Sequence, residues 1–305
     1  MAGGCLVVGY GSIGARHARL LRALDRPTAV VSGREVEFAP LYDNLDAALD
    51  AEQPDYVVVS NDTARHHETL ARLATLGFEG TVLVEKPLFE RARAIPENRF
   101  RGLYVGYNLR FHPVIRALRE SMNGDGALSA QAYVGQHLAG WRPGRDYRAT
   151  ASASAERGGG ALRDLSHELD LLFRLFGPWR RLAALGGAFS NLEIDSDDAW
   201  ALLLELDGCP AATLQLNYLD RGGRRDLIVI GEDHSYHADL SGGTLTVDGD
   251  CVRFDLGADD SYLAQHKAVL EQEGAGVCTL EEGLAVVDAI EAAERAASEG
   301  RWVET

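Results

Sequence analysis

The apolar run Cys5-Leu6-Val7-Val8 leads directly into Gly9-Tyr10-Gly11-Ser12-Ile13-Gly14, and a helical segment follows. In a Gly-x-Gly-x-x-Gly loop, the first glycine permits a tight turn and the second lets the backbone approach a pyrophosphate. The third lets the helix pack close to the strand, and the helix amino end faces the phosphates. The alternative is a glycine turn that binds no ligand, but strand, loop and helix stand in the order that dinucleotide binding requires. The predicted contacts are Gly9, Gly11, Ser12, Ile13 and Gly14.

The first 122 residues continue this alternation of strands and helices. Continuous apolar runs lie at 5–8, 28–31, 56–59, 81–84 and 103–105, and helical segments at 13–24, 45–50, 64–76 and 113–122. Continuously apolar strands are typical of a parallel sheet that is buried on both faces. The pattern therefore predicts a doubly wound α/β Rossmann domain over residues 1–122.

Residues 123–305 show a different order of elements. One helix is expected over 162–176, ended by Gly177-Pro178, and successive strands follow between 181 and 256, with a hairpin turn at Asp248-Gly249. Two more helices are expected at 262–272 and 280–298. Strands joined by short turns favour antiparallel pairing. We therefore expect an α+β substrate-binding and oligomerisation domain with a large, mostly antiparallel open sheet, and we expect the last helix to pack back on the Rossmann domain.

Composition restricts the class of protein. The chain is 46% hydrophobic and 25% charged, as in ordinary globular proteins, and its net charge is −16. This acidity disfavours nucleic acid and anionic membranes as partners. No apolar run approaches the roughly 20 residues of a membrane span, and the first strand lacks a basic leader, so we expect a cytoplasmic protein. The four cysteines form no close pair, so we expect no metal site.

The end of the second strand bears on the choice of cofactor. Ser32-Gly33-Arg34 stands where NAD enzymes commonly carry an acidic residue for the ribose hydroxyls. A 2′-phosphate prefers hydroxyl and guanidinium donors, so Ser32 and Arg34 favour NADP. Glu35 is adjacent and keeps NAD open as an alternative.

A lysine follows the fourth strand, in Glu85-Lys86-Pro87, at the sheet edge where open α/β sheets bind ligands. Of 30 basic residues, only Lys86 and Lys267 are lysine. A buried lysine can release its proton near neutral pH, whereas arginine cannot. Lys86 is therefore a candidate for proton transfer beside a nicotinamide, the alternative being an ordinary lysine at a strand end.

A local cluster of arginines interrupts the acidic sequence. Residues 140–163 contain five arginines against two acidic residues. The cluster is either a solvated loop or a pocket for an anionic substrate.

Together these motifs resemble the Gfo/Idh/MocA family, the relatives of glucose–fructose oxidoreductase and inositol dehydrogenase. The matching elements occur in the family's order and are Gly9–Gly14, Ser60-Asn61 with His66, Glu85-Lys86-Pro87, Gly106–Pro113 and Gly158–Asp170. The run Trp141–Arg148, followed by Gly158–Asp170, also resembles a subgroup linked to surface-sugar biosynthesis in bacteria.

The resemblance implies roles for individual residues. Lys86 would act in proton transfer and help to seat the nicotinamide, and His167 would be its acid/base partner, with Asp164 nearby. The cofactor would also be lined by Ser60, Asn61, His66, Glu85 and Asn108. Family members pair through the face of the second domain's sheet, which implies a homodimer or homotetramer.

The chain departs from the family pattern around the candidate histidine. Asp164 precedes His167 by three positions instead of four, and Arg163 occupies the fourth. On a helix both neighbours share a face with His167, so the pair can still cooperate, and Asp170 is an alternative orienter. The segment between Pro87 and Leu103 is short and has little helical periodicity, so we expect the family's usual long helix to be missing.

The predicted function is hydride transfer between a nicotinamide cofactor, NADP or alternatively NAD, and the carbinol or ketone of a sugar or nucleotide sugar. A base must accept the hydroxyl proton, and either His167 or Lys86 is suited to do so. The small-molecule substrate is expected to be sugar-like and anionic, with contacts from Arg110, Trp141, Arg142, Tyr147, Arg148, Arg163 and Asp170. The alternatives are a glycosidase that oxidises its substrate transiently with bound cofactor and a non-catalytic NADP-binding sensor. The presence of both Lys86 and His167 argues against the sensor.

Overall fold

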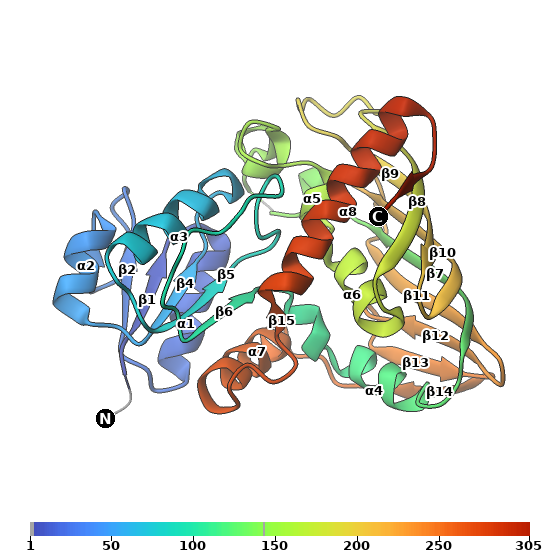
Figure 1. Ribbon diagram of the computed structural model, residues 1–305, viewed down its shortest axis with the longest axis horizontal. Helices are drawn as coiled ribbons and strands as arrows, with labels where there is room; N and C mark the ends of the chain where they lie inside the picture. Colours follow the sequence, from blue (N-terminus) through green and yellow to red (C-terminus); the bar gives the residue numbers. More distant parts are fainter. Residues whose placement is uncertain (1–2, 143) are drawn as a thin grey trace. The chain divides into compact units, whose positions relative to one another are not determined.

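The computed structural model describes residues 3–142 and 144–305. The chain forms two compact units (Figure 1). Unit 1 contains Met1–Asn108 and Asp259–Leu284, and unit 2 contains Leu109–Ala258 and Ala285–Thr305. Each unit is built around its own sheet.

Unit 1 contains a seven-stranded sheet in the order β15-β6-β5-β4-β1-β2-β3. Its strands are β1 (Cys5–Val8), β2 (Thr28–Val31), β3 (Leu41–Tyr42), β4 (Tyr56–Val59), β5 (Thr81–Val84), β6 (Gly102–Val105) and β15 (Cys278–Thr279). Every pairing is parallel except that of β15 with β6. The helices are α1 (Ser12–Ala23), α2 (Leu45–Glu52), α3 (His66–Thr75) and α7 (Asp260–Glu271). The predicted Rossmann fold is confirmed.

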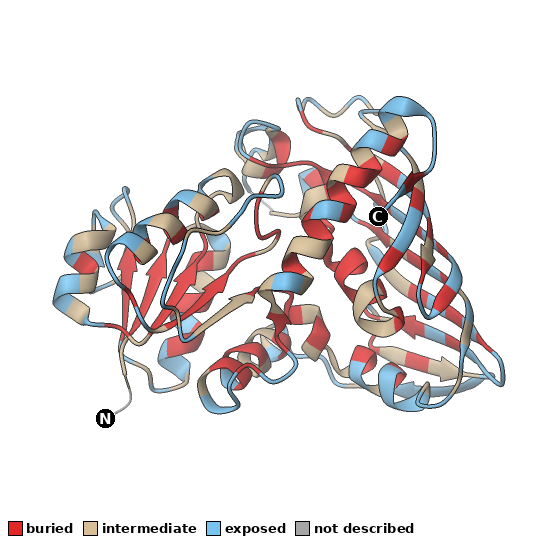
Figure 2. Ribbon diagram, viewed as in Figure 1, coloured by how far each residue is buried: buried red, intermediate tan, exposed pale blue. Residues whose placement is uncertain are grey.

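The register of this sheet decides where ligand-binding residues gather. Val8 of β1 pairs with Val59 of β4, and Val59 pairs with Val84 of β5. These three strands are buried along their whole length, because their Val and Leu side chains face covered surfaces on both sides (Figure 2). The residues that follow them therefore leave the sheet at one common edge, the carboxyl edge.

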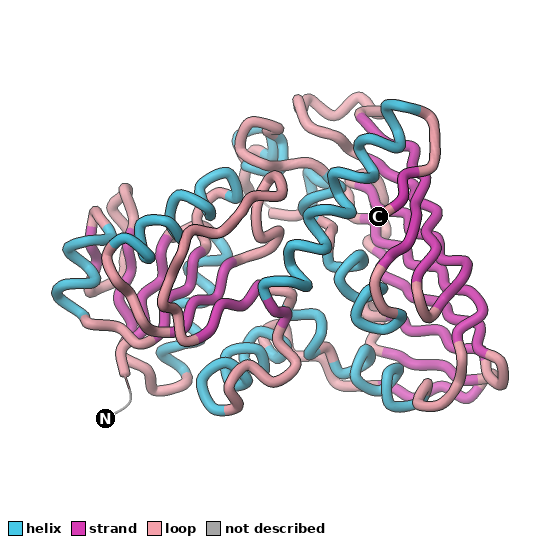
Figure 3. Tube along the Cα trace, in the orientation of Figure 1, coloured by secondary structure: helices cyan, strands magenta, loops and turns pink. Residues whose placement is uncertain are grey.

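Unit 2 contains a nine-stranded sheet in the order β14-β13-β12-β11-β7-β10-β9-β8-β16. Its strands are β7 (Ala127–Gly135), β8 (Trp179–Gly187), β9 (Ala199–Leu206), β10 (Cys209–Asn217), β11 (Arg224–Gly231), β12 (Ser235–Asp239), β13 (Thr244–Val247), β14 (Asp250–Arg253) and β16 (Val303–Glu304). Only β7 and β10 pair in parallel. The expectation of a large, mostly antiparallel sheet is confirmed. Figure 3 shows its strands in magenta.

Helices pack on one face of the second sheet. They are α4 (Pro113–Ser121), α5 (Ala161–Asp164) and α6 (His167–Phe176); α8 (Leu280–Glu299) begins in unit 1 and continues into unit 2. Helices α5 and α6 contact the central strands β9, β10 and β7, and α4 contacts β12 and β13. Side chains alternate accordingly along β9, where Leu202 and Leu204 are buried and Leu203 is exposed.

Two local expectations need correction and two are confirmed. The single helix expected over 162–176 is divided into α5 and α6 by a break at Leu165-Ser166. Strand β7 lies where no strand was expected, because its Ala, Ser and Gln residues give a weak apolar signal. The hairpin at Asp248-Gly249 is confirmed, with φ angles of 49° and 99°. The segment between Pro87 and Leu103 contains no helix, as expected.

In the described part of the chain, no helix combines the length and apolar character that a membrane crossing requires. No cluster of three or more His, Cys, Asp or Glu side chains among those residues is arranged to hold a metal ion.

Candidate active site

The glycine loop follows β1 and begins α1. Gly9 has φ of 97°, and a Cβ there would lie 2.6 Å from the Asn61 backbone nitrogen. A Cβ on Gly14 would lie 2.1 Å from the Gly9 carbonyl oxygen, so the helix and the loop need glycine at both positions. A Cβ on Gly11 would meet nothing within 4 Å. The open space beside Gly11, at the amino end of a 12-residue helix, fits the pyrophosphate of a dinucleotide.

The residues after β4 support this loop. Ser60 is buried and donates to the carbonyl oxygens of Val8 and Gly9 at 3.2 and 3.1 Å. Asn61 donates from Nδ2 to Thr69 at 2.8 Å, while its buried Oδ1 has no hydrogen-bond partner among the described residues. Ser60 therefore shapes the loop, and Asn61 offers an acceptor to a ligand donor.

His66, the first residue of α3, joins two loops of the carboxyl edge. Its Nδ1 lies 3.2 Å from the Pro87 carbonyl oxygen and 3.1 Å from that of Leu88, and its Nε2 lies 3.1 Å from the Asn61 carbonyl oxygen. Burial lowers the pKa of His66 below its usual value. The ring thus lies between the segment after β4 and the turn after β5, with backbone carbonyl oxygens beside both nitrogens.

Glu85 and Lys86 follow β5. Glu85 is buried; its Oε1 lies 2.9 Å from His17 Nε2, and its Oε2 accepts from the Lys86 backbone N–H at 3.2 Å. The Lys86 side chain is half-buried. Asn108, which follows β6, is buried and donates to Ser261 Oγ at 2.7 Å. Five of the predicted cofactor residues thus lie in the segments that follow β4, β5 and β6: Ser60, Asn61, Glu85, Lys86 and Asn108.

Ser32 and Arg34 form a compact turn after β2. Ser32 Oγ donates to the Arg34 carbonyl oxygen and accepts from the Arg34 N–H, both at 3.1 Å. The exposed Arg34 guanidinium reaches the Tyr10 carbonyl oxygen of the glycine loop at 3.5 Å. The turn therefore presents a cation to the loop that fits the pyrophosphate.

Unit 1 fits a nicotinamide dinucleotide on two independent observations. The space beside Gly11, at the amino end of a helix, is open enough for a phosphate. The buried Asn61 Oδ1 has no donor among the described residues, and a ligand could supply one. Gly9, Gly11, Ser12 and Ile13 would hold the pyrophosphate, and Asn61 would accept from a ribose hydroxyl or an amide group of the ligand.

In unit 2, the candidate histidine begins α6. His167 is its first residue and is buried, and α5 ends three residues earlier at Asp164. The start of α5 is anchored by Asp197, whose Oδ1 accepts from Leu162 N–H at 2.9 Å and from the Trp200 indole at 2.7 Å. Burial raises the pKa of Asp197.

Asp164 is engaged by a tyrosine. The buried Tyr218 hydroxyl donates to Asp164 Oδ2 at 2.7 Å, and its ring packs edge-on against Trp141 with centroids 5.2 Å apart. Burial raises the pKa of Tyr218 well above its usual value, and the negative charge of Asp164 adds to this, so the hydroxyl remains a donor. Asp164 is thereby linked to the tryptophan of the predicted substrate segment.

Arg110 and Asp170 form a buried ion pair. Arg110 Nη2 lies 2.6 Å from Asp170 Oδ1, and both side chains are almost fully buried. The same guanidinium donates from Nε to both carboxylate oxygens. The pair joins the segment before α4 to α6, and this contact accounts for the burial of both groups.

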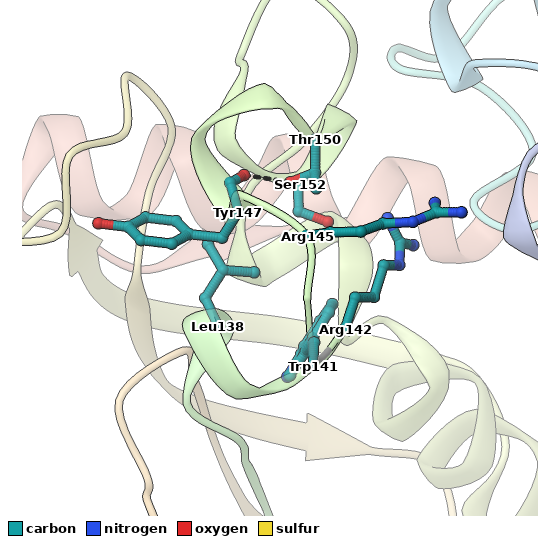
Figure 4. A pocket seen from close by; sticks show the side chains of 7 residues that line it. All are labelled: Leu138, Trp141, Arg142, Arg145, Tyr147, Thr150 and Ser152. Carbon is teal, nitrogen blue, oxygen red and sulfur yellow. Dashed lines mark hydrogen bonds between the residues drawn. The ribbon is translucent and has the colours of Figure 1, made fainter.

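A small pocket lies within the arginine-rich segment (Figure 4). It is lined by Leu138, Trp141, Arg142, Arg145, Tyr147, Thr150 and Ser152. In Figure 4 the guanidinium groups of Arg142 and Arg145 lie on the same side of the pocket, away from the Tyr147 ring. The Trp141 indole nitrogen is buried and has no hydrogen-bond partner in the described ranges.

The arginines of this segment differ in their partners. Arg148 pairs with Asp146 at 2.8 Å and with Glu193 at 2.9 Å, and Arg163 pairs with Glu294 at 2.6 Å. Neither Arg142 nor Arg145 has an acidic partner within 4 Å among residues 3–142 and 144–305. The segment thus has two uncompensated positive charges beside the pocket.

Sequence reasoning missed three residues that the structure places in these networks. They are His17, Tyr218 and Asp197. His17 had a detectable signal, because it shares the buried face of α1 with Gly14, Ala18 and Leu21. Asp197 and Tyr218 lie far from α5 in sequence, and no local pattern reveals their partners.

Known protein families match both parts of the chain. The model of an oxidoreductase family with an NAD-binding Rossmann fold matches residues 4–98. The model of the GFO/IDH/MocA C-terminal domain matches residues 118–237. No curated protein matched the sequence.

Solved structures resemble the chain over nearly its full length. GenD2 from gentamicin A biosynthesis, in complex with NAD, is 26% identical, with a TM-score of 0.81 and coverage of 99% of this chain and 96% of that one. Levoglucosan dehydrogenase in complex with NADH is 14% identical, with a TM-score of 0.85 and coverage of 99% and 98%. The WlbA dehydrogenase from Bordetella pertussis, in complex with NADH and UDP-GlcNAcA, is 17% identical, with a TM-score of 0.82 and coverage of 99% and 97%. The last two support the fold alone.

The family models cover the Rossmann part and the sheet-bearing part in the order in which the chain carries them. The predicted resemblance is confirmed: the chain belongs to the Gfo/Idh/MocA family of oxidoreductases and begins with an NAD-binding Rossmann domain.

Proposed function

We propose that this protein is an NAD(P)-dependent oxidoreductase that exchanges hydride with the carbinol or ketone carbon of an anionic sugar or nucleotide sugar. The observation that carries the substrate class is the pocket beside Trp141. It combines a buried indole donor that lacks a partner among the described residues with two arginines that lack acidic partners there. A ligand with hydroxyl and phosphate or carboxylate oxygens would satisfy all three groups.

The charge pattern separates these two arginines from their neighbours. Arg148 is compensated by Asp146 and Glu193, so it gains little from an additional anion. Arg142 and Arg145 have no acidic partner within 4 Å among the described residues, although the net charge of the chain is −16. A guanidinium group binds a carboxylate or a phosphate through two charge-assisted hydrogen bonds, which are strong and fix its orientation.

The names of the structural relatives favour a sugar-like substrate and do not decide its charge. The WlbA dehydrogenase was solved with UDP-GlcNAcA, and GenD2 comes from gentamicin A biosynthesis. Levoglucosan dehydrogenase was also solved with levoglucosan. We infer a sugar-like substrate for this chain from these proteins and from its own pocket.

The chemistry assigns tasks to Lys86, His167 and Asp164. When bound, the nicotinamide supplies or accepts the hydride. The carbinol proton must then pass to or from a base, and Lys86 and His167 are the two candidates. His167 stands at the amino end of α6, and Asp164, which accepts a hydrogen bond from Tyr218, ends α5 three residues earlier. We assign the proton transfer to this set and leave the immediate base open between Lys86 and His167.

We further propose that NADP is preferred over NAD. Ser32 presents a hydroxyl, and Arg34 presents a cation beside the glycine loop, where an acidic side chain would favour the unphosphorylated ribose. The exposed Glu35 limits this preference and leaves NAD as a second substrate.

Titration of the purified protein with NADPH and NADH, followed by nicotinamide fluorescence, tests the cofactor. We expect both to bind and NADPH to bind more tightly, and Ser32→Asp should reverse the order by repelling the 2′-phosphate. Tighter NADH binding by the wild type would overturn the preference while leaving the oxidoreductase assignment intact. Binding of neither, in protein isolated without copurified cofactor, would overturn the assignment.

A screen of nucleotide sugars and acidic sugars tests the substrate class. Arg142→Ala and Arg145→Ala should each raise the KM for an anionic sugar roughly tenfold to a hundredfold, since each removes a contact to a charged group. Arg148→Ala is the matched control, because its charge is already compensated, and should change KM less than about twofold. Equal effects of all three variants, or turnover of neutral sugars only, would contradict an anionic substrate.

A further inference from the structure

Four buried polar side chains form a continuous line through unit 1. Glu85 Oε1 lies 2.9 Å from His17 Nε2, His17 Nδ1 lies 2.9 Å from His266 Nε2, and His266 Nδ1 lies 3.0 Å from the Tyr56 hydroxyl. His17 and His266 are 0% exposed, Tyr56 is 1% exposed and Glu85 is 7% exposed. Neither the glycine loop nor the proposed proton transfer explains why polar groups occupy this core.

The line connects four elements that are distant in sequence. His17 lies on α1, His266 on α7, Tyr56 at the start of β4, and Glu85 directly after β5. Helices α1 and α7 pack against one another within unit 1. The carboxylate end of the line is the residue before Lys86, so it meets the turn that carries a proposed acid/base group.

The Tyr56 end of the line decides which nitrogen of each histidine carries the proton. Burial raises the pKa of Tyr56 well above its usual value, so its hydroxyl keeps its proton. Burial lowers the pKa of His266 well below its usual value, so this ring is neutral. A neutral imidazole has one N–H and one acceptor nitrogen. If Tyr56 donates to His266 Nδ1, then His266 Nε2 donates to His17 Nδ1, and His17 Nε2 donates to Glu85.

The opposite order leaves a buried group unsatisfied. His266 Nδ1 would then donate to the Tyr56 oxygen, and the Tyr56 proton would need another acceptor. The Tyr56 hydroxyl has no second hydrogen-bond partner in the described ranges 3–142 and 144–305. A buried donor without an acceptor is unfavourable, so the line has one preferred direction. A second proton on His17 would impose this opposite order as well. His17 Nδ1–H would donate to His266 Nε2, and His266 would then have to donate from Nδ1 to Tyr56.

We propose that Tyr56, His266 and His17 form a one-way hydrogen-bonded chain that holds the Glu85 carboxylate and, through it, positions the Lys86 turn. Glu85 then accepts from His17 Nε2–H at one oxygen and from the Lys86 N–H at the other. Gly106 leaves room for this carboxylate, since a Cβ there would lie 2.8 Å from Glu85 Oε1. The three residues are positioning residues, and their importance for turnover rests on the function proposed for Lys86.

The first test reads the protons directly. Nitrogen-15 NMR of the histidine-labelled protein, without cofactor and at neutral pH, distinguishes protonated from bare ring nitrogens. We expect Nε2 to be protonated and Nδ1 to be bare in both His17 and His266, with the two rings assigned by the signals lost in His17→Gln and His266→Gln. A protonated Nδ1 in either ring would overturn the proposed direction.

The second test asks whether the chain reaches the Lys86 turn. Tyr56→Phe keeps the ring and removes the donor, so exchange of the Lys86 amide hydrogen should accelerate by about tenfold or more. Tyr236→Phe is the matched control, because Tyr236 is an equally buried tyrosine of unit 2 whose hydroxyl donates to Asp125 at 2.9 Å. Unchanged Lys86 exchange in Tyr56→Phe, or equal acceleration in both variants, would overturn the proposal.

A pair of substitutions at His17 separates hydrogen bonding from packing. A glutamine side chain at this position would retain both a donor and an acceptor, whereas a leucine side chain would retain neither. His17→Gln should therefore keep Lys86 exchange slow, and His17→Leu should not. Equal exchange in the two variants would contradict the chain.

None of these readouts requires turnover or cofactor. The two proposals can therefore fail independently. If the NMR and exchange results are as expected but the protein transfers no hydride, the hydrogen-bonded chain stands and the proposed reaction is wrong.

Discussion

At the scale of single residues, the two lysines provide an internal comparison. Lys86 follows a buried strand at the carboxyl edge of the Rossmann sheet, while Lys267 is exposed on α7. Lys86→Ala keeps the backbone N–H that Glu85 binds, so the turn should persist and cofactor affinity should change little. Turnover should fall roughly a hundredfold or more if Lys86 transfers a proton.

Steady-state kinetics and cofactor titration of Lys86→Ala and Lys267→Ala check this expectation. Lys267→Ala should behave as the wild type in both measurements. Turnover of Lys86→Ala at the wild-type rate would remove this lysine from the mechanism and leave His167 as the remaining candidate base.

His112 gives unit 2 a stability that depends on pH. Burial, with Arg225 adding to it, lowers the pKa of His112 from 6.5 to about 4. The unfolded chain therefore binds more protons between these values, so stability is full above pH 6.5, is lost as pH falls toward 4, and is constant below. Because the ring is partly solvated, the loss should be about 1–2 kcal/mol.

Urea unfolding at a series of pH values tests this linkage. His112→Gln should show a smaller loss of stability between pH 6.5 and 4 than the wild type. His67→Gln, at a half-buried histidine of α3, is the control and should follow the wild-type curve. Parallel curves for the wild type and His112→Gln would show that His112 does not contribute.

The candidate site was predictable from sequence where its chemistry is local. The roles of the glycine loop and of the lysine after a strand can be predicted from a few neighbouring residues, because backbone conformation and strand position decide them. The chain through His17 and His266 was not predictable, since its members are separated by 249 positions and each looks like an ordinary core residue alone.

At the scale of elements, the start of α5 depends on one glycine. Gly160 has φ of 118° and ψ of 152°, a conformation essentially restricted to glycine. A Cβ there would also lie 2.2 Å from Asp197 Oδ2, the carboxylate that anchors α5. Gly160→Ala should therefore lower the free energy of unfolding by about 1–3 kcal/mol and displace the α5 residue Asp164.

Gly140→Ala is the matched control, because a Cβ at Gly140 would meet nothing within 4 Å and its φ is not positive. Denaturant unfolding should place this variant close to the wild type. If both variants unfold at the same denaturant concentration, Gly160 is not required for the α5 conformation.

Helix and strand patterns were recovered to different degrees for physical reasons. The four strands of the Rossmann sheet that are buried at every position were all predicted from sequence. The break between α5 and α6 was missed, because Leu165 and Ser166 continue the helical periodicity and the anchor that fixes α5 comes from Asp197. Strand β7 was missed because its partners on both sides, and not its own composition, stabilise it.

At the scale of the whole molecule, the nine-stranded sheet carries large apolar side chains on a face that is exposed to solvent. Leu203 on β9 is 44% exposed and lies between Ala183 of β8 and Thr213 of β10. Leu185, Ile228 and Ile230 are exposed on strands of the same sheet. Exposed apolar side chains gathered on one face of a sheet favour self-association, and closed symmetric pairs are the commonest result.

We therefore expect the wild type to sediment as a dimer or tetramer at micromolar concentration, with this face covered by a second copy. Leu203→Asp places a charge in the middle of the face and should yield monomers whose far-ultraviolet circular dichroism is unchanged, because the side chain does not belong to the buried core. Leu76→Asp, at an exposed leucine after α3, is the control and should remain associated. A wild type that sediments as a monomer would refute the association. If the Leu203→Asp variant remains associated, the association must use a different surface. A buried aspartate without a partner would be unfavourable between two apolar faces.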